Sequence, residues 1–300
     1  MQKTVKYTDY LAITLLTLVA YVWLFLTPSF AQGNSPANPN QVKAGYAKVN
    51  GLNMYYEVRS NGQPIVVLHG AAMSTAGMEA FTSSLAKSRK VIAVDLQGHG
   101  RTADIDRPLS YESMADDVIA LLKQLSIPTT DVFGYSMGAG VAFQVAVRQP
   151  KLVRKLVLVS VYTDPKGYYP EVTESIKQLT PEALAGTPFA QEYLKVAPRP
   201  QDLVKLMNKI KTLDLGFAGW SAEAVRRVKA PTLLVIGDAD IVRPEHTVEL
   251  FRWLGGGVPG DLVELPKTQL AVMPGTTHFT VLERTQWLMP MITKFLDASK

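Results

Sequence analysis

The chain has 300 residues, 47% of them hydrophobic and 19% charged, which is enough to bury one large core or two modest ones. Its net charge is +5, and the basic residues are scattered rather than gathered in a stripe, which argues against a nucleic acid as partner. Cysteine is absent, which excludes disulfides, thiol catalysis and thiolate metal sites.

Residues 1–31 have the layout of a secretory signal peptide. A short basic region precedes an uncharged apolar run over residues 11–26, and the small residues Ser29 and Ala31 suit cleavage after Ala31. The run is short for a spanning helix, which needs about 20 residues, and an uncleaved membrane anchor is the alternative. We expect a secreted or periplasmic protein without stable membrane contact after cleavage, and a flexible linker over residues 32–42.

Two segments on either side of Asn50-Gly51, residues 46–49 and 54–58, predict an antiparallel hairpin, because this pair accepts the positive φ of a tight turn. Six apolar runs then predict strands that are buried on both faces. They lie at residues 64–68, 90–95, 130–134, 156–160, 232–237 and 269–273.

Helical patterns separate these runs, at residues 78–87, 111–125, 137–148, 244–254 and 279–296. Ser110 is the expected N-cap of the second helix, and Pro290 should kink or split the last one. Strands that alternate with helices predict an α/β fold, with a mostly parallel eight-stranded sheet flanked by helices.

Residues 164–230 break this alternation, because they have helical patterns but no strand. The segment lies between the expected strands 6 and 7, so we predict a helical cap over the carboxyl ends of the strands, where such sheets bind ligands. The expected organisation is a core at residues 43–163, the cap at 164–230 and a second part of the core at 231–300.

Gly134-Tyr135-Ser136-Met137-Gly138 stands between an apolar strand and a buried helix, as a G-x-S-x-G nucleophile turn requires. The turn is so tight that side chains at the two glycine positions would collide with the neighbouring strand and helix. Ser136 is therefore the candidate nucleophile, and the N–H of Met137 should point toward a bound carbonyl oxygen.

A serine hydroxyl needs a positioned base, and the chain has four histidines. His69 and His99 lie in turns after upstream strands, and His246 lies inside a helix, where we expect it to be solvated. His278 follows the last predicted strand, in a loop that can reach back over the nucleophile, and is the candidate base.

The acid that orients this base should follow a strand at the same edge of the sheet. Asp238 and Asp240 both do so, and Asp164 is a third candidate. We favour Asp240, because it lies further into the loop and can reach His278, whereas Asp238 should brace the turn through backbone N–H groups.

Acyl transfer also needs two N–H donors for the developing oxyanion. The N–H of Met137 is one, and the loop over residues 69–73 should supply the other, with Ala71 as the best candidate. No metal site or organic cofactor is implied, because the histidines lack ligand spacing and no Gly-rich phosphate loop with a lysine is present.

These motifs, in this order, resemble the α/β-hydrolase superfamily over about residues 46–296. The resemblance is to small capped serine esterases, and implies that a small or medium apolar carboxylic ester is cleaved through an acyl-enzyme. Hydrolysis of a C–C bond, lactone, thioester or amide stays open, as do a cofactor-free haloperoxidase or perhydrolase and a non-catalytic binding protein. Related dehalogenases and epoxide hydrolases carry Asp at the nucleophile position, so Ser136 argues against both activities.

Overall fold

The structure is a computed structural model that describes residues 41–184 and 186–299. The expected signal peptide and residues 32–40 of the expected linker lie outside these residues, and Val42, at the end of that linker, already begins the first strand. Within the described part of the chain, no helix is both long enough and apolar enough to cross a membrane.

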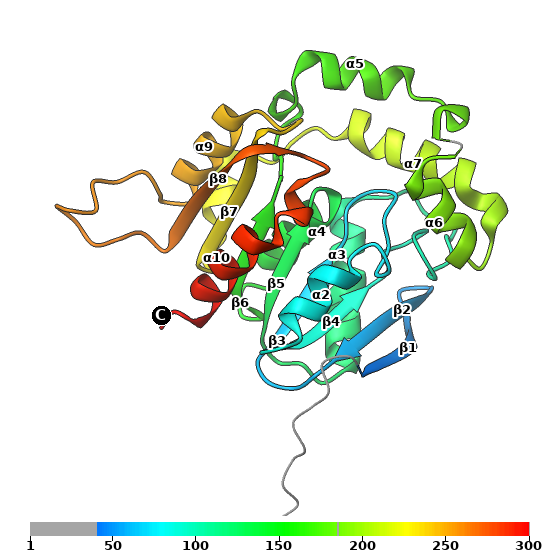
Figure 1. The fold of residues 1–300 in the computed structure, drawn as a ribbon, viewed down its shortest axis with the longest axis horizontal. Helices are drawn as coiled ribbons and strands as arrows, with labels where there is room; N and C mark the ends of the chain where they lie inside the picture. Colours follow the sequence, from blue (N-terminus) through cyan, green and yellow to red (C-terminus); the bar gives the residue numbers. More distant parts are fainter. Residues whose placement is uncertain (1–40, 185, 300) are drawn as a thin grey trace, which may run out of the picture. The chain divides into compact units, whose positions relative to one another are not determined.

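Eight strands form one sheet in the order β1-β2-β4-β3-β5-β6-β7-β8 (Figure 1). Strands β3 to β8 are parallel, whereas β1 and β2 form an antiparallel hairpin that joins β4 through β2. The mostly parallel eight-stranded sheet is therefore confirmed. The strands are β1 (Val42–Val49), β2 (Leu52–Arg59), β3 (Pro64–Leu68), β4 (Lys90–Val94), β5 (Thr130–Tyr135), β6 (Val153–Val159), β7 (Thr232–Ala239) and β8 (Thr268–Thr277).

The last strand is longer than the sequence predicts, because it continues through Pro274 and Gly275 to Thr277. β8 is an edge strand, where a proline can face away from the ladder, so these two residues do not end it. The pairing of Ala239 with Thr277 carries the β7–β8 contact to its last residues.

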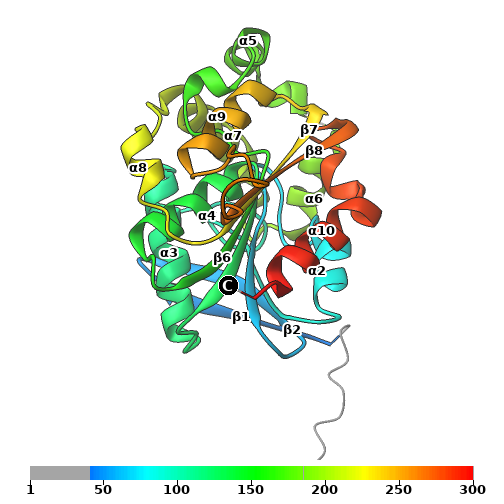
Figure 2. The same ribbon diagram turned by 90° about the vertical axis from the view of Figure 1, so that its left-hand side faces the viewer.

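Helices cover both faces of the sheet (Figures 1 and 2). One face carries α3 (Tyr111–Gln124), α4 (Met137–Arg148) and α9 (Pro244–Trp253), and the other carries α2 (Glu79–Leu85) and α10 (Thr285–Asp297). The alternation of side chains along each strand builds a separate core on each face. In β3, Val66 and Leu68 join the core of α3 and α4, whereas Ile65 and Val67 join the core of α2 and α10.

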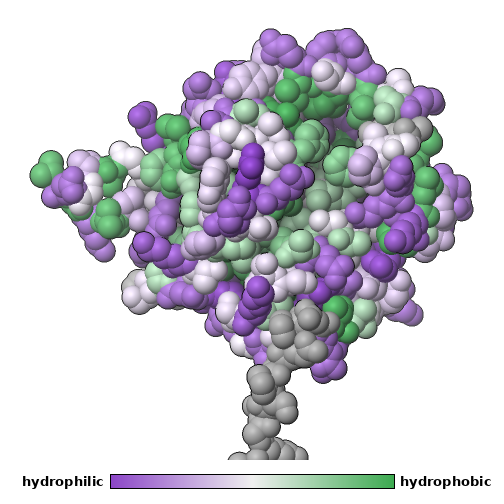
Figure 3. Space-filling model, viewed as in Figure 1, coloured by the Kyte–Doolittle hydropathy of each residue, from purple (hydrophilic) through white to green (hydrophobic). Residues whose placement is uncertain are grey.

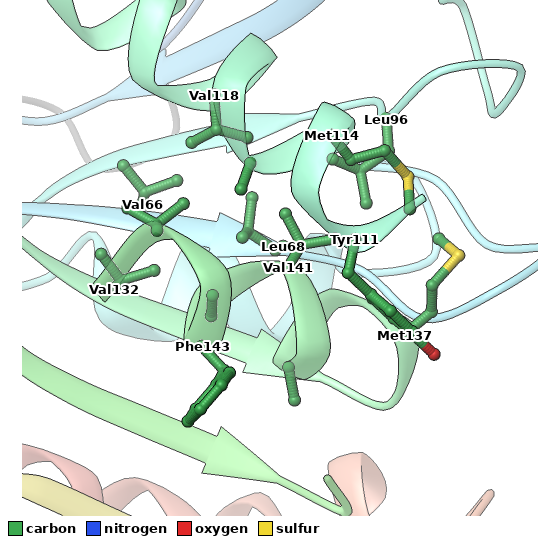
Figure 4. Close-up of a cluster of buried hydrophobic side chains, with 14 of the residues drawn as sticks. Val66, Leu68, Leu96, Tyr111, Met114, Val118, Val132, Met137, Val141 and Phe143 are labelled. Carbon is green, nitrogen blue, oxygen red and sulfur yellow. The ribbon is translucent and has the colours of Figure 1, made fainter. Parts of the chain in front are cut away.

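Helix α4 is buried from Met137 to Ala146, as its apolar sequence predicts. Figure 4 shows Met137, Val141 and Phe143 of this helix among side chains from β3, β5 and α3. Ser110 caps α3 by accepting a hydrogen bond from the N–H of Ser113, which confirms the predicted cap. The helix that begins with Met137 is thus held rigidly in the larger core.

The C-terminal helix differs from the expectation. Residues 279–284 are not part of it, because η4 (Val281–Glu283) is a short 3₁₀ turn and α10 begins only at Thr285. Of the two outcomes expected at Pro290, a kink or a split, the split is wrong, since α10 runs through this residue. Pro290 is exposed, so the Gln286 carbonyl that it cannot bond lies on the side of the helix that faces solvent.

The predicted helical cap between β6 and β7 is present. Helix α7 attaches it to the core through buried apolar side chains, among them Leu206 and Ile210, and through an ion pair between Lys209 and Asp104 at 2.7 Å. Five cap segments begin with a proline, whose fixed φ suits the first helical turn. The segments are η1 (Pro165–Gly167), α5 (Pro170–Gln178), η2 (Pro181–Leu184), α6 (Pro188–Val196), η3 (Pro200–Asp202), α7 (Leu203–Gly216) and α8 (Ala222–Arg226).

Candidate active site

The strand order brings two distant turns together. β3 and β5 are neighbours in the sheet although α2, β4 and α3 separate them in the chain, and Leu68 pairs with Gly134. The strand order reverses at this point, which is where open α/β sheets form their binding crevices. The turn over residues 69–73 therefore lies beside Ser136.

Ser136 lies on the strained turn that its sequence motif predicts. Its φ of 54° and ψ of −121° fall in a region that side-chain-bearing residues rarely occupy. A Cβ atom at Gly134 would overlap the carbonyl oxygen of Gly138, and one at Gly138 would overlap the carbonyl oxygen of His69. As predicted, a side chain at either glycine position would therefore collide with neighbouring backbone atoms.

Asp240 and His278 become neighbours through the pairing of β7 with β8. Each directly follows one member of the Ala239–Thr277 pair. His278 Nδ1 lies 2.8 Å from Asp240 Oδ1, and His278 Nε2 lies 3.0 Å from the Oγ of Ser136. The Asp240 and His278 side chains are buried, whereas Ser136 is partly accessible. The structure thus joins the three residues in one hydrogen-bonded series.

Both carboxylate oxygens of Asp240 are held by further donors. The Ser160 hydroxyl donates to Oδ2 at 2.6 Å, and the N–H of Val242 donates to Oδ1 at 3.0 Å. Burial alone would raise the pKa of Asp240, but the hydrogen bond and charge of His278, together with these donors, hold it below its usual value. Sequence reasoning missed Ser160, although its place directly after β6, at the same edge of the sheet, was a usable signal.

Two more contacts fix the segment that carries His278. The hydroxyl of Tyr135, inside the nucleophile motif, donates to the His278 carbonyl oxygen at 2.8 Å. Asp238 accepts from the N–H groups of Gly275 at 3.0 Å and Thr276 at 3.1 Å, and these bonds lower its pKa. Asp238 therefore braces backbone N–H groups as predicted, including those of the neighbouring strand β8.

The other histidines have backbone partners. In His69, Nδ1 lies 2.8 Å from the Gly70 carbonyl oxygen and Nε2 accepts from the N–H of Leu96 at 3.1 Å, so the ring is held neutral. His99 Nδ1 lies 2.9 Å from the carbonyl oxygen of Gln97.

The expectation that His246 is solvated is wrong. The side chain is 3% exposed, and its Nε2 accepts from the N–H of Thr163 at 3.0 Å. The histidine lies on the face of α9 that packs against the start of the cap, which a helical pattern alone does not reveal. Asp164, the third acid candidate, caps η1 by accepting from the N–H of Lys166 and is not in the series with His278.

Both expected oxyanion donors lie near Ser136. Met137 follows it in the chain, and Ala71 lies in the turn after β3, the strand that pairs with β5. Met137 is the first residue of α4, where helix N–H groups have no partner within the helix. Ala71 lines the cavity next to Ser136. Neither N–H is bonded to another group of residues 41–184 and 186–299, so both are available to a bound oxygen.

A cavity of about 460 Å³ opens onto Ser136 and His278. Its walls combine the turn of Ala71 with apolar cap side chains, among them Val172 and Ile176 of α5. Figure 3 shows apolar surface gathered beneath α5, at the top of that view. The full lining is Gly70, Ala71, Met73, Tyr135, Ser136, Tyr168, Glu171, Val172, Ser175, Ile176, Leu179, Phe189, Asp214, Ile241, His278 and Phe279.

The aromatic residues around the cap have three different environments. Tyr168 and Phe189 line the cavity, whereas Tyr169 is exposed. The others, Tyr162, Phe217 and Trp220, pack against Tyr111 of α3. Three of the six therefore pack against the core helix α3, and two line the cavity. Within the residues that the structure describes, no three His, Asp or Glu side chains are grouped so that they could hold a metal ion.

Comparison with known proteins decides the family. A model described as the alpha/beta hydrolase fold matches residues 63–206. The uncharacterized protein Rv2715 of Mycobacterium tuberculosis is 32% identical over 297 residues, which cover 85% of this chain and 81% of that protein. The chain belongs to the α/β-hydrolase superfamily. The resemblance drawn from the motifs is thereby confirmed, and the family match supports a hydrolase.

Other members of the superfamily are similar over different lengths. The sn-1-specific diacylglycerol lipase ABHD11 of Danio rerio is 35% identical over 115 residues, which cover 37% of this chain and 36% of that lipase. This match therefore spans about a third of the lipase. The structure of a thermophilic esterase from Thermogutta terrifontis matches with a TM-score of 0.63 at 23% identity, over 85% of this chain and 98% of that one. The similarity to this esterase structure shows that the two proteins share a fold.

Proposed function

We propose that this α/β-hydrolase is a serine hydrolase that cleaves carboxylic esters of small or medium apolar substrates through an acyl-enzyme. One observation carries the proposal, namely the series from Ser136 Oγ through the two ring nitrogens of His278 to Asp240 at the floor of an apolar cavity. The lipase and esterase among the similar proteins support the choice of an ester.

In the proposed reaction, His278 Nε2 takes the hydroxyl proton of Ser136 as Oγ attacks the ester carbonyl carbon. The carbonyl oxygen becomes an oxyanion, which accepts hydrogen bonds from the N–H groups of Ala71 and Met137. Asp240 keeps the proton of His278 on Nδ1 and stabilises the imidazolium. When the tetrahedral intermediate collapses, His278 returns its proton to the leaving alcohol, and the acyl group stays on Ser136.

Deacylation repeats these steps with water. His278 removes a proton from a water molecule, whose oxygen attacks the acyl carbon and forms a second oxyanion in the same place. Collapse of this intermediate breaks the bond to Ser136 Oγ, which regains its proton from His278. The carboxylic acid is released, and no cofactor is required at any step.

The first test is hydrolysis of p-nitrophenyl esters, from acetate to dodecanoate, by the chain from Gln32 onward. The Ser136→Ala variant should lose about 10⁴-fold or more of kcat with an unchanged circular dichroism spectrum, because the nucleophile is gone. Ser88→Ala is the matched control, since this side chain is exposed and precedes the amino end of β4, whereas Ser136 follows the carboxyl end of the parallel strand β5. Wild-type activity in Ser136→Ala would show that the nucleophile is misassigned.

The same experiment separates the alternative reactions. A folded wild-type protein without turnover on any ester would favour a C–C bond or an amide as the substrate bond, or a binding protein. Turnover that requires both peroxide and an added carboxylic acid would favour perhydrolysis. The chain length with the highest kcat/KM gives the size of the acyl pocket.

We also propose that the protein is exported and cleaved after Ala31, on the strength of its N-terminal sequence. N-terminal sequencing of the protein from a secreting host should start at Gln32. A product that keeps residues 1–31 and sediments with membranes would support the anchor instead.

A further inference from the structure

The cavity beside Ser136 contains a carboxylate that the proposed mechanism does not use. Asp214 comes from α7 of the cap, far from Asp240 in the chain, and it lines the same cavity as Ser136 and His278. The side chain is partly buried. A carboxylate in a largely apolar cavity is costly unless it is paired, so its surroundings indicate what it binds.

One oxygen of Asp214 is already bonded. The hydroxyl of Tyr162 donates to Oδ1 at 2.8 Å, and the hydroxyl of Tyr111 lies 2.8 Å from that of Tyr162. Since the Tyr162 proton points to Asp214, Tyr111 donates to Tyr162. Burial raises the pKa of both tyrosines above their usual range, so they remain protonated donors. The two tyrosines therefore fix the position of the Asp214 carboxylate, which can still accept hydrogen bonds from other donors.

In the described residues 41–184 and 186–299, the hydrogen bond from Tyr162 reaches Oδ1, and the other oxygen, Oδ2, accepts none. Burial raises the pKa of Asp214 to about 6, while the Tyr162 bond and the charge of His278 act in the opposite direction. The carboxylate form therefore predominates above about pH 6. In the lining of the cavity, Glu171 is a second carboxylate, and none of the lining residues is a lysine or arginine.

We propose that Asp214 is a specificity-determining residue that accepts a hydrogen bond from a hydroxyl or ammonium group of the substrate and excludes substrates with a carboxylate there. The inference rests on the proposed function, because it assigns a substrate class to the same cavity. A donor from the substrate satisfies Oδ2, whereas an anionic group of the substrate is repelled by the Asp214 carboxylate in a largely apolar cavity whose lining includes no lysine or arginine.

The test uses p-nitrophenyl esters whose acyl chains are matched in length and end in methyl, hydroxyl, ammonium or carboxylate. Their dissociation constants are measured by calorimetry with the Ser136→Ala variant, which keeps the esters intact whatever bond the enzyme cleaves. We expect the hydroxyl and ammonium esters to bind about tenfold or more tightly than the carboxylate ester, as hydrogen bonds to charged groups do.

Asp214→Asn in the Ser136→Ala background should remove most of this difference and leave binding of the methyl ester within about threefold. The amide oxygen of Asn still accepts from Tyr162, so the position of the side chain is kept. Tyr162→Phe is the matched control, because it removes the structural bond but keeps the charge, and discrimination should persist in it. Glu171→Gln should have a smaller effect, since this side chain is exposed and screened.

The outcomes distinguish the two proposals. Equal binding of the four esters, or discrimination that Asp214→Asn leaves unchanged and Tyr162→Phe removes, overturns the role of Asp214. Turnover of the methyl ester by the wild type, lost in Ser136→Ala, supports the proposed function whichever way the binding result falls. In the wild type, the effect of Asp214→Asn should appear in KM for the hydroxyl and ammonium esters, with kcat for the methyl ester retained.

Discussion

At the scale of single residues, Asp240 shows how position determines the role of a carboxylate. Asp238 lies two residues earlier and binds the backbone of β8, whereas Asp240 faces His278 and is held by Ser160 and Val242. Only the second arrangement leaves a carboxylate oxygen opposite a ring nitrogen. The hydrogen bond between Asp240 Oδ1 and His278 Nδ1 keeps the proton of the neutral ring on Nδ1. His278 Nε2 then carries no proton and can accept the hydroxyl proton of Ser136.

This geometry predicts a large effect for Asp240→Asn. The Asn amide can present a donor to Nδ1, which favours the tautomer with a proton on Nε2 and prevents His278 from acting as a base. We expect kcat for the best p-nitrophenyl ester to fall by about 10⁴-fold. Ser160→Ala keeps the carboxylate and should cost only about tenfold. Similar activities of the two variants at equal folded fractions would contradict the assignment.

At the scale of elements, the nucleophile turn depends on close contact among β3, β5 and α4. The glycines of the motif allow that contact, since a Cβ at Gly138 would overlap the backbone of both Leu68 and His69. Any displacement there also moves the turn that carries Ala71. The stability of this region and the geometry of the site are therefore coupled.

Gly138→Ala should lower the free energy of unfolding by about 2 kcal/mol or more, because backbone atoms cannot move aside as a side chain can. Gly216→Ala is the matched control, since a Cβ at this last residue of α7 meets nothing within 4 Å. It should be neutral or stabilising by roughly 0.5–1 kcal/mol, because alanine has the better helix propensity. Urea unfolding measures both, and equal midpoints for the two variants would refute the proposed packing constraint.

At the scale of the whole molecule, buried histidines link stability to pH. Burial lowers the pKa of His69 to about 4 and that of His99 to about 3, and also lowers the pKa of His246. The unfolded chain binds protons at these residues below about pH 6.5, while the folded chain does not. Burial raises the pKa of Asp95 and of Asp214 to about 6 and also raises that of Asp131, so these three carboxyls act in the opposite direction.

The unfolded histidines, with an ordinary pKa of about 6.5, bind protons at a higher pH than Asp95 and Asp214 do in the folded chain. We therefore expect stability to fall as the pH drops from about 7 to about 5, because the unfolded state binds more protons. His69 alone accounts for a contribution on the order of 3 kcal/mol that is lost between about pH 6.5 and 4. Urea unfolding at several pH values measures the slope. His99→Gln should reduce it, and a stability that is flat or rises on acidification would show that these histidines are not buried in neutral form.

The amino-acid sequence by itself determined the class of fold and the central side chains of the site. Apolar runs of strand length between helical patterns imply a parallel sheet, and the hairpin turns at Asn50 and Gly51 as its dipeptide predicts. Ser136 was recognisable because the constraints on its turn are local: two glycines, a strand before and a helix after. His278 could be selected because few histidines compete with it.

Only the tertiary structure decided which side chains surround these residues. Ser160, Tyr135 and Asp214 reach the site through the order of the strands and the packing of the cap, which no local pattern encodes. The burial of His246 and the extension of β8 past Pro274 likewise depend on neighbours that are distant in the chain. The physical reason is that a residue's intrinsic preferences act over a few positions, whereas hydrogen-bond partners and burial are set by pairing across the sheet and by contacts between layers.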